Sequence, residues 1–76
     1  MNTSPDQKET LRFIGDHIRY YRVKRGWSQE QLAFESDLHR TYIGAVERGE
    51  RNITVLNLLK IKDTLHVQLT DLYPEG

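Results

Sequence analysis

The apolar residues between positions 11 and 21 recur at helical spacing. They are Leu11, Ile14, Ile18 and Tyr21, and residues three or four apart share one face of a helix. The segment Ser4-Pro5-Asp6-Gln7 supplies, in order, an N-cap, a proline suited to the first turn, an early acid and a capping-box glutamine. The pattern predicts a helix from about residue 5 to Lys24-Arg25-Gly26, where cations suit the last turn, with residues 1–4 frayed.

A second helix is predicted to start after Ser28. This residue is a strong N-cap whose hydroxyl can accept the N–H of Gln31, while the Gln31 side chain reaches back in a capping box. Leu32 and Ala33 supply the buried face, and the small Ala33 lets another helix approach closely. Ser36 and the aspartate after it compete for backbone hydrogen bonds, so this helix is expected to end near Ser36.

The chain is expected to reverse at Asp37, in a left-handed conformation that Asp tolerates better than most residues. Leu38 then plugs the turn, and a third helix runs from about residue 39 to residue 48, with Gly49 as its C-terminal cap. Its buried positions are Ile43 and Val46, and its outward positions are Arg40, Thr41, Gly44, Ala45 and Arg48. Two short helices joined by a tight turn form a helix-turn-helix, whose second helix can enter the major groove of DNA.

The last third of the sequence predicts two more helices. Thr54 caps the first of them, which runs to about Leu65, and the second spans roughly residues 69–72 before Pro74 ends it. The residues expected to face the core are Val55, Leu58, Ile61 and Leu65 in the longer helix, and Val67, Leu69 and Leu72 around the shorter one. The whole pattern predicts an all-α, compact five-helix bundle in which residues 1–76 form a single domain.

The length and composition of the chain limit the stability of such a bundle and the kinds of site that it can hold. A core built from 76 residues usually supplies only about 3–5 kcal/mol of net stability, so dimerisation would be a natural supplement. The absence of cysteine excludes disulfides and thiolate metal sites, and it fits a reducing cytoplasm. No apolar run resembles a membrane span or a signal-peptide core, so a cytoplasmic protein is expected.

The formal net charge is zero at pH 7, which by itself argues against a nucleic-acid partner. The distribution of charge argues the other way. Basic residues gather in the middle of the sequence, at Arg19, Arg22, Lys24, Arg25, Arg40, Arg48 and Arg51, whereas six of the eleven acids lie near the two ends, at Asp6, Glu9, Asp16, Asp63, Asp71 and Glu75. One face of the domain is therefore expected to be positive.

The middle of the chain resembles the helix-turn-helix of the phage-repressor-like, or Xre/Cro, superfamily. The match covers Ile-Arg-x-x-Arg, Gly-x-Ser-Gln-x-x-Leu-Ala and Ile-x-x-x-Glu-Arg-Gly, through Arg19, Arg22, Gly26, Ser28, Gln29, Leu32, Ala33, Ile43, Glu47, Arg48 and Gly49. The resemblance extends from about Ile14 to Leu72 and implies a lambda-repressor-like DNA-binding domain, with its helix-turn-helix at about residues 28–48.

Within that superfamily, Leu-His-Arg-Thr-Tyr-Ile followed by Glu-Arg-Gly-Glu-Arg-Asn-Ile-Thr is similar to the controller proteins of restriction-modification systems. Phage and other bacterial regulators share this phrase, so they stay as the alternative. Lys62 and His66 depart from the superfamily pattern, which usually has Ala and Gly there. We expect Lys62 to extend its ammonium to water and His66 to be left-handed.

The candidate base-reading residues lie on the recognition helix, at about residues 39–48. Arg40 can bind guanine O6 and N7 together, and Thr41 can offer its hydroxyl or pack its methyl group against thymine. Ala45 can touch a thymine methyl, or it can simply favour the helix. Tyr42 can contact a phosphate or base, or it can pack partly in the core. Without the surrounding motif, Arg40 would be read as a solvated surface residue.

The candidate phosphate-binding residues flank this helix. They are Ser28 and Gln29, at a helix N-terminus that attracts anions, and Arg48, Arg51 and Asn52 after the recognition helix. Arg51 can also probe a groove, and any one of these side chains can be merely solvated. The resemblance pairs Arg22 with Glu47 as a structural ion pair, whose disruption would cost about 3–5 kcal/mol.

Ile53, Leu56 and Leu59 are the candidate dimer interface, although scattered surface leucines are common. A two-fold dimer would set two recognition helices about one DNA turn apart and would require a pseudo-palindromic operator.

The three histidines have no metal-ligand spacing, and no phosphate loop or nucleophile elbow is present, so no metal, cofactor, small-molecule ligand or enzyme activity is expected. The sequence predicts a homodimeric DNA-binding transcriptional regulator with double-stranded DNA as its partner and no membrane. The alternative is an antitoxin-like or coactivator-like protein-interaction module of the same fold, because fold alone does not determine function.

Overall fold

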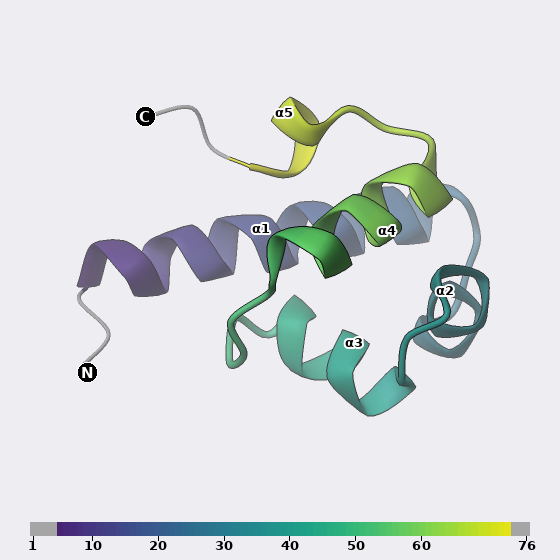
Figure 1. Ribbon diagram of the computed structural model, residues 1–76, viewed down its shortest axis with the longest axis horizontal. Helices are drawn as coiled ribbons and strands as arrows, with labels where there is room; N and C mark the ends of the chain where they lie inside the picture. Colours follow the sequence, from purple (N-terminus) through teal and green to yellow (C-terminus); the bar gives the residue numbers. More distant parts are fainter. Residues whose placement is uncertain (1–4, 74–76) are drawn as a thin grey trace.

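The computed structural model describes residues 5–73, and every regular element in that range is a helix. Figure 1 shows the helices in chain order: α1 (Pro5–Lys24), α2 (Gln29–Ser36), α3 (Arg40–Glu47), α4 (Val55–Leu65) and α5 (Leu69–Leu72). The prediction of an all-α, five-helix domain is therefore confirmed, with helix boundaries close to those expected. The predicted N-cap at Ser4 and the predicted fraying of residues 1–4 lie outside the described residues.

The long helix α1 lies at the centre of the packing, and α3, α4 and α5 all pack against it (Figure 1). Helix α2 packs against α3 and α4 and closes one end of the bundle. The fully buried side chains come from every helix and include Ile18, Leu32, Ile43, Val46, Ile61 and Leu72. The helix-turn-helix is thus seated on a core to which all five helices contribute.

The turn between α2 and α3 is built as the sequence predicted. Ser28 caps α2 by accepting the N–H of Gln31 at 3.0 Å. Asp37 is left-handed, with φ 57° and ψ 43°, and the next residue donates its N–H to Ala33 O at 2.9 Å. The predicted capping box is wrong, because the Gln31 side chain instead donates to Glu35, one turn along the helix, at 2.8 Å.

The end of α4 confirms two further expectations. His66 is left-handed, with φ 57°, and its N–H is donated to Asp63 O as the helix closes. The Lys62 ammonium reaches out to the exposed Asp63 carboxylate at 2.7 Å. A residue other than glycine therefore ends this helix without changing where it stops.

Two predicted core residues are exposed instead. Val55 is 71 % exposed and Leu69 is also classed as exposed. Each is the first residue of its helix and follows an exposed N-cap residue. The helical spacing of apolar residues predicted that Val55 and Leu69 face inward. The buried side of α4 in fact starts one turn later, at Leu58.

Candidate nucleic-acid interface

The recognition helix α3 turns one side to the core and the other to solvent. Ile43 and Val46 are buried, whereas Arg40 and Thr41 in its first turn are exposed. Ala45 is half-buried. Two of the four side chains predicted to read bases, Arg40 and Thr41, are thus exposed where a DNA groove could meet them, while the same helix is held by its apolar side.

The first turn of α3 faces the N-terminus of α2 across a surface hollow of about 620 Å³. Its lining residues are Arg22, Ser28, Gln29, Glu30, Arg40, Thr41, Gly44 and Arg48. The hollow therefore brings together two candidate base readers and three candidate phosphate ligands that are spread over residues 28–48. It also contains Glu30, whose carboxylate forms an exposed ion pair with Arg40.

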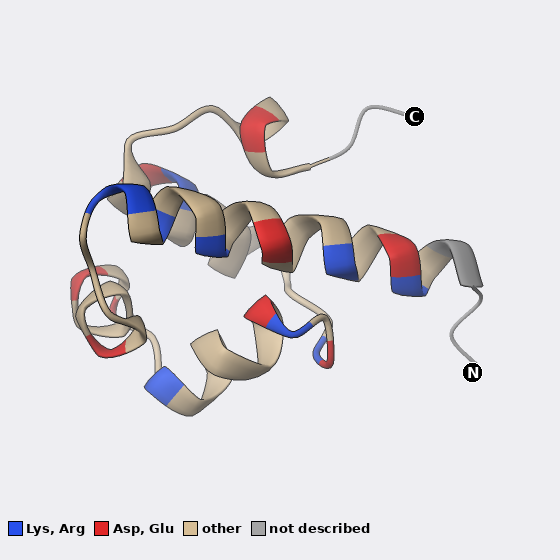
Figure 2. Cartoon of the chain, turned by 180° about the vertical axis from the view of Figure 1, so that it is seen from behind, with Lys and Arg blue, Asp and Glu red and all other residues tan. Residues whose placement is uncertain are grey.

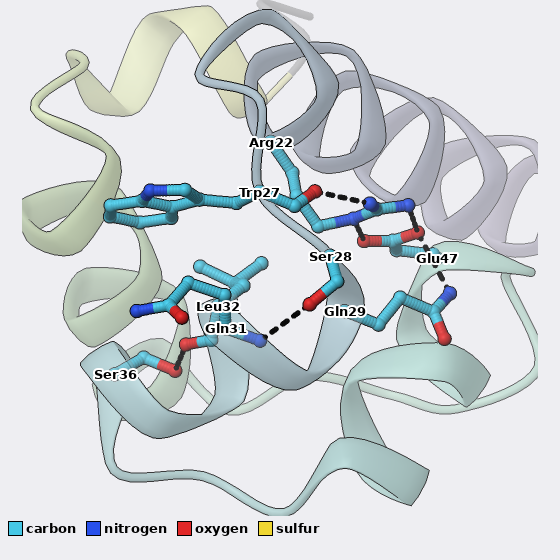
Figure 3. A network of polar contacts seen from close by, with 8 residues as sticks. All are labelled: Arg22, Trp27, Ser28, Gln29, Gln31, Leu32, Ser36 and Glu47. Carbon is cyan, nitrogen blue, oxygen red and sulfur yellow. Dashed lines mark hydrogen bonds and ion pairs between the residues drawn. The ribbon is translucent and has the colours of Figure 1, made fainter.

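A buried polar network lies behind this hollow (Figure 3). Arg22 on α1 makes a bidentate pair with Glu47 on α3, through Nε to Oε2 at 2.6 Å and Nη2 to Oε1 at 2.9 Å. Its third donor, Nη1, reaches Trp27 O at 2.8 Å. Arg22 is 9 % exposed and Glu47 is 5 % exposed, so water does little to screen the pair. The network ties the long helix to the last turn of the recognition helix.

Gln29 belongs to this network as well as to the surface. Its side-chain nitrogen donates to Glu47 Oε1 at 3.1 Å, which engages one of its two amide N–H groups. Its backbone N–H, at the first position of α2, has no acceptor four residues earlier within the helix. Gln29 therefore offers an anion both a backbone donor and the remaining side-chain N–H.

Tyr42 points from α3 towards α4. Its half-buried ring packs against the core, and its hydroxyl accepts a hydrogen bond from Asn57 Nδ2 at 3.1 Å. The Arg51 guanidinium lies over the same ring, 5.4 Å from its centroid. The expectation of partial core packing fits this placement, and the hydroxyl keeps its own proton for donation to a phosphate or base.

The remaining candidate phosphate ligands lie beyond the other end of α3. Arg48 pairs with Glu50 at 3.0 Å, and Asn52 is exposed. Arg48 and Asn52 line a second hollow, of about 640 Å³, together with Lys8 and Arg12 of α1. Arg48 lines both hollows, so Ser28 and Gln29 form a first group, Asn52 lies in a second group beyond the other end of the recognition helix, and Arg48 joins the two.

Sequence reasoning missed the basic residues of α1 that flank the second group. Arg12 and Arg19 also line a third hollow, of about 510 Å³, with Gln29 and Arg48. The spacing of Lys8, Arg12 and Arg19 places them on one side of a helix, and this was the available signal. Acidic and basic positions alternate along α1 (Figure 2), and Glu9, Asp16 and Glu50 share the lining of the second and third hollows, so acids interrupt the positive charge there.

The predicted dimer patch is only partly exposed. Leu56 is 73 % exposed, whereas Ile53 and Leu59 are half-buried. The unexpected exposure of Val55 adds apolar surface beside Leu56 in the sequence.

Residues 5–73 contain no cluster of three metal-ligating side chains. Over the same range, no helix is both long enough and apolar enough to cross a membrane.

Residues 18–72 match the family described as HTH_3, helix-turn-helix. The chain belongs to this helix-turn-helix family. Its relatives include the control protein C.BamHI of Bacillus amyloliquefaciens, which is 52 % identical over 60 residues, spanning 78 % of this chain and 74 % of the relative. The sequence segment Arg-Thr-Tyr-Ile predicted a resemblance to restriction-modification controller proteins. This prediction is confirmed, because a controller protein is among the similar relatives.

Two solved structures of controller proteins are also similar to this chain. The restriction-modification controller protein C.AhdI from Aeromonas hydrophila is 43 % identical, with a TM-score of 0.80 over 83 % of this chain and 96 % of that chain. The controller protein C.Esp1396I, solved as a tetramer with its natural 35 base-pair operator, is 39 % identical, with a TM-score of 0.73 over 78 % of each chain. The helix-turn-helix fold is thus shared with a protein that has been seen on operator DNA.

Proposed function

We propose that this protein is a sequence-specific transcriptional regulator that binds a pseudo-palindromic operator as a homodimer. The observation that carries the proposal is the exposed first turn of α3, which presents Arg40 and Thr41 beside the N-terminus of α2. An α3 inserted in a major groove would bring that N-terminus to the DNA backbone. The operator complex of C.Esp1396I supports the choice of double-stranded DNA as the partner.

In this proposal the residues divide into two roles. Arg40 and Thr41 read base edges, with Ala45 and Tyr42 as further contacts one turn along or to the side. The backbone is held by Ser28, Gln29, Arg48, Arg51 and Asn52, and we add Arg12 of α1 because it lies beside Arg48 in the second hollow. The domain acts by binding rather than by catalysis.

The relatives support a finer statement of what is regulated. Restriction-modification controllers are among the most similar proteins, both by sequence and by structure. We infer that the regulated genes belong to a restriction-modification system, and that occupancy of the operator is set by the concentration of the protein.

The decisive experiment is selection of bound duplexes from a randomised DNA pool, followed by affinity measurements over a range of salt. We expect a two-fold symmetric site and a preference over scrambled duplex of about a thousandfold or more. Arg12, Arg48 and Arg51 of each protomer would neutralise about six phosphates per dimer, so log K should fall against log salt with a slope of about −5. Equal affinity for all duplexes would contradict the proposal and would favour a protein-interaction module.

The proposed dimer patch is Ile53, Leu56 and Leu59, and it can be tested apart from DNA. Replacing the exposed Leu56 by Glu should raise the monomer fraction in analytical ultracentrifugation, because a charge would be buried at the interface. Phe34→Glu is the matched control, since Phe34 is an equally exposed apolar residue on α2. A monomer fraction that Leu56→Glu leaves unchanged, or that both variants raise alike, would place the interface elsewhere.

A further inference from the structure

The ion pair between Glu30 and Arg40 joins the two helices of the motif at the surface proposed to meet DNA. Glu30 lies in the first turn of α2 and Arg40 in the first turn of α3, and both line the same hollow. Their side chains are 70 % and 66 % exposed. An ion pair this exposed contributes little to folding stability, so stability does not account for its place on the working surface.

The atoms used by the pair decide what Arg40 can still do. The Glu30 carboxylate binds Nη1 of the guanidinium. The opposite edge, Nε and Nη2, stays open and has the two parallel donors that guanine O6 and N7 require. The pair therefore holds the arginine without occupying the edge that would read a base.

The charge of Glu30 also selects among the partners of Arg40. A phosphate approaching this guanidinium would meet a full negative charge beside it, whereas a guanine edge carries only partial charges. An arginine without this neighbour would sample many rotamers and could bind either partner. The Glu30 carboxylate thus weakens a contact between Arg40 and a phosphate more than a contact between Arg40 and a guanine. Only the guanine contact depends on the DNA sequence.

We propose that Glu30 is a positioning residue for sequence readout: its carboxylate orients Arg40 towards a base edge and keeps it from the phosphate backbone. The inference rests on the proposed function, since it concerns how the same surface discriminates between DNA sequences. Glu30 itself need not touch DNA.

The chain offers a matched control for the test. Glu35 is a second exposed glutamate on α2, but its carboxylate accepts a hydrogen bond from Gln31 and pairs with no arginine within residues 5–73. Glu30→Ala and Glu35→Ala remove the same charge from the same helix, and only the first releases Arg40. Any general gain in affinity from losing a negative charge should appear in both variants.

The measurement is the ratio of affinities for the selected operator and for a scrambled duplex, at one salt concentration. Glu30→Ala should lower this ratio about tenfold, with the loss concentrated at the base pair where Arg40→Ala also loses discrimination. Glu35→Ala should leave the ratio unchanged. Affinities for a set of operators, each with one base pair changed, show at which base pair the discrimination is lost.

The possible failures are distinguishable. A wild-type protein without any operator preference would overturn the proposed function and this inference together. A wild-type protein that discriminates, with the same ratio in Glu30→Ala and Glu35→Ala, would overturn the positioning role alone. A loss in Glu30→Ala spread evenly over all base pairs would also overturn it, because orientation of one arginine acts at one position.

Discussion

The two ends of the recognition helix are held in opposite ways. At its last turn, Glu47 is buried and bound by a bidentate arginine, whereas at its first turn Arg40 is exposed and paired only with another exposed side chain. Both contacts are Arg–Glu ion pairs between different helices. The difference in burial separates their roles, because the inner pair sets where the helix lies and the outer pair leaves one edge of the Arg40 guanidinium open to DNA.

The close approach of α1 and α3 strengthens the inner end further. A Cβ on Gly15 would lie 2.4 Å from Val46 O and 2.6 Å from Glu47 O, which leaves no room for any side chain. At the outer side of α3, a Cβ on Gly44 would meet only side-chain tips, Arg48 Nη1 at 3.2 Å and Gln29 Oε1 at 3.3 Å. The close contact at Gly15 is with backbone atoms, whereas the contact at Gly44 is with the ends of side chains.

The largest expected effect comes from breaking the inner pair. Glu47→Ala leaves the buried Arg22 guanidinium without its carboxylate and should lower the free energy of unfolding by about 3–5 kcal/mol. Denaturant unfolding measures this loss. Glu30→Ala is the control, and similar losses in the two variants would contradict the contrast between inner and outer pairs.

A smaller effect should follow from filling the close approach. Gly15→Ala pushes a methyl group against the backbone of α3 and should destabilise the fold by about 1–3 kcal/mol, partly offset by the better helix propensity of alanine. Thermal unfolding checks this. Gly44→Ala should keep or raise the melting temperature, and a Gly15→Ala protein as stable as wild type would show that α1 and α3 can separate without cost.

At the outer end, the expected effect is on binding rather than on folding. Arg40→Ala should cost about 1–3 kcal/mol at the cognate operator and relax the preference at one base position. Gln29→Ala should weaken binding to all duplexes alike, since its proposed partner is a phosphate. Affinities measured on singly substituted operators compare the two, and equal losses of specificity would contradict this division of roles.

The smallest effect is expected from the outer pair on stability. Glu30→Ala should change the free energy of unfolding by no more than about 1 kcal/mol, because both side chains are exposed. Chemical denaturation in low and high salt measures the change. A loss as large as that of Glu47→Ala would mean that the outer pair holds the fold and is not available to DNA.

Sequence reasoning succeeded where the determinants are local. Left-handed Asp37, the Ser28 and Thr54 caps and the ends of α2 and α4 follow from residues within a turn of each other. The fold class followed because each helix has its own apolar stripe.

Reasoning from the sequence failed where the outcome depends on how helices meet. Gly15 gives no local sign that a carbonyl of α3 will lie against it. The partners Glu30 and Arg40 are ten residues apart on separate helices, and the Tyr42–Asn57 hydrogen bond spans 15 residues. Such contacts require the relative placement of elements, which periodicity does not supply.

The absence of any side chain between α1 and α3 at Gly15 has a mechanical consequence. Neither helix can move closer to the other at this point without driving backbone atoms together, so the missing side chain fixes how near the DNA-reading helix stands to the long helix.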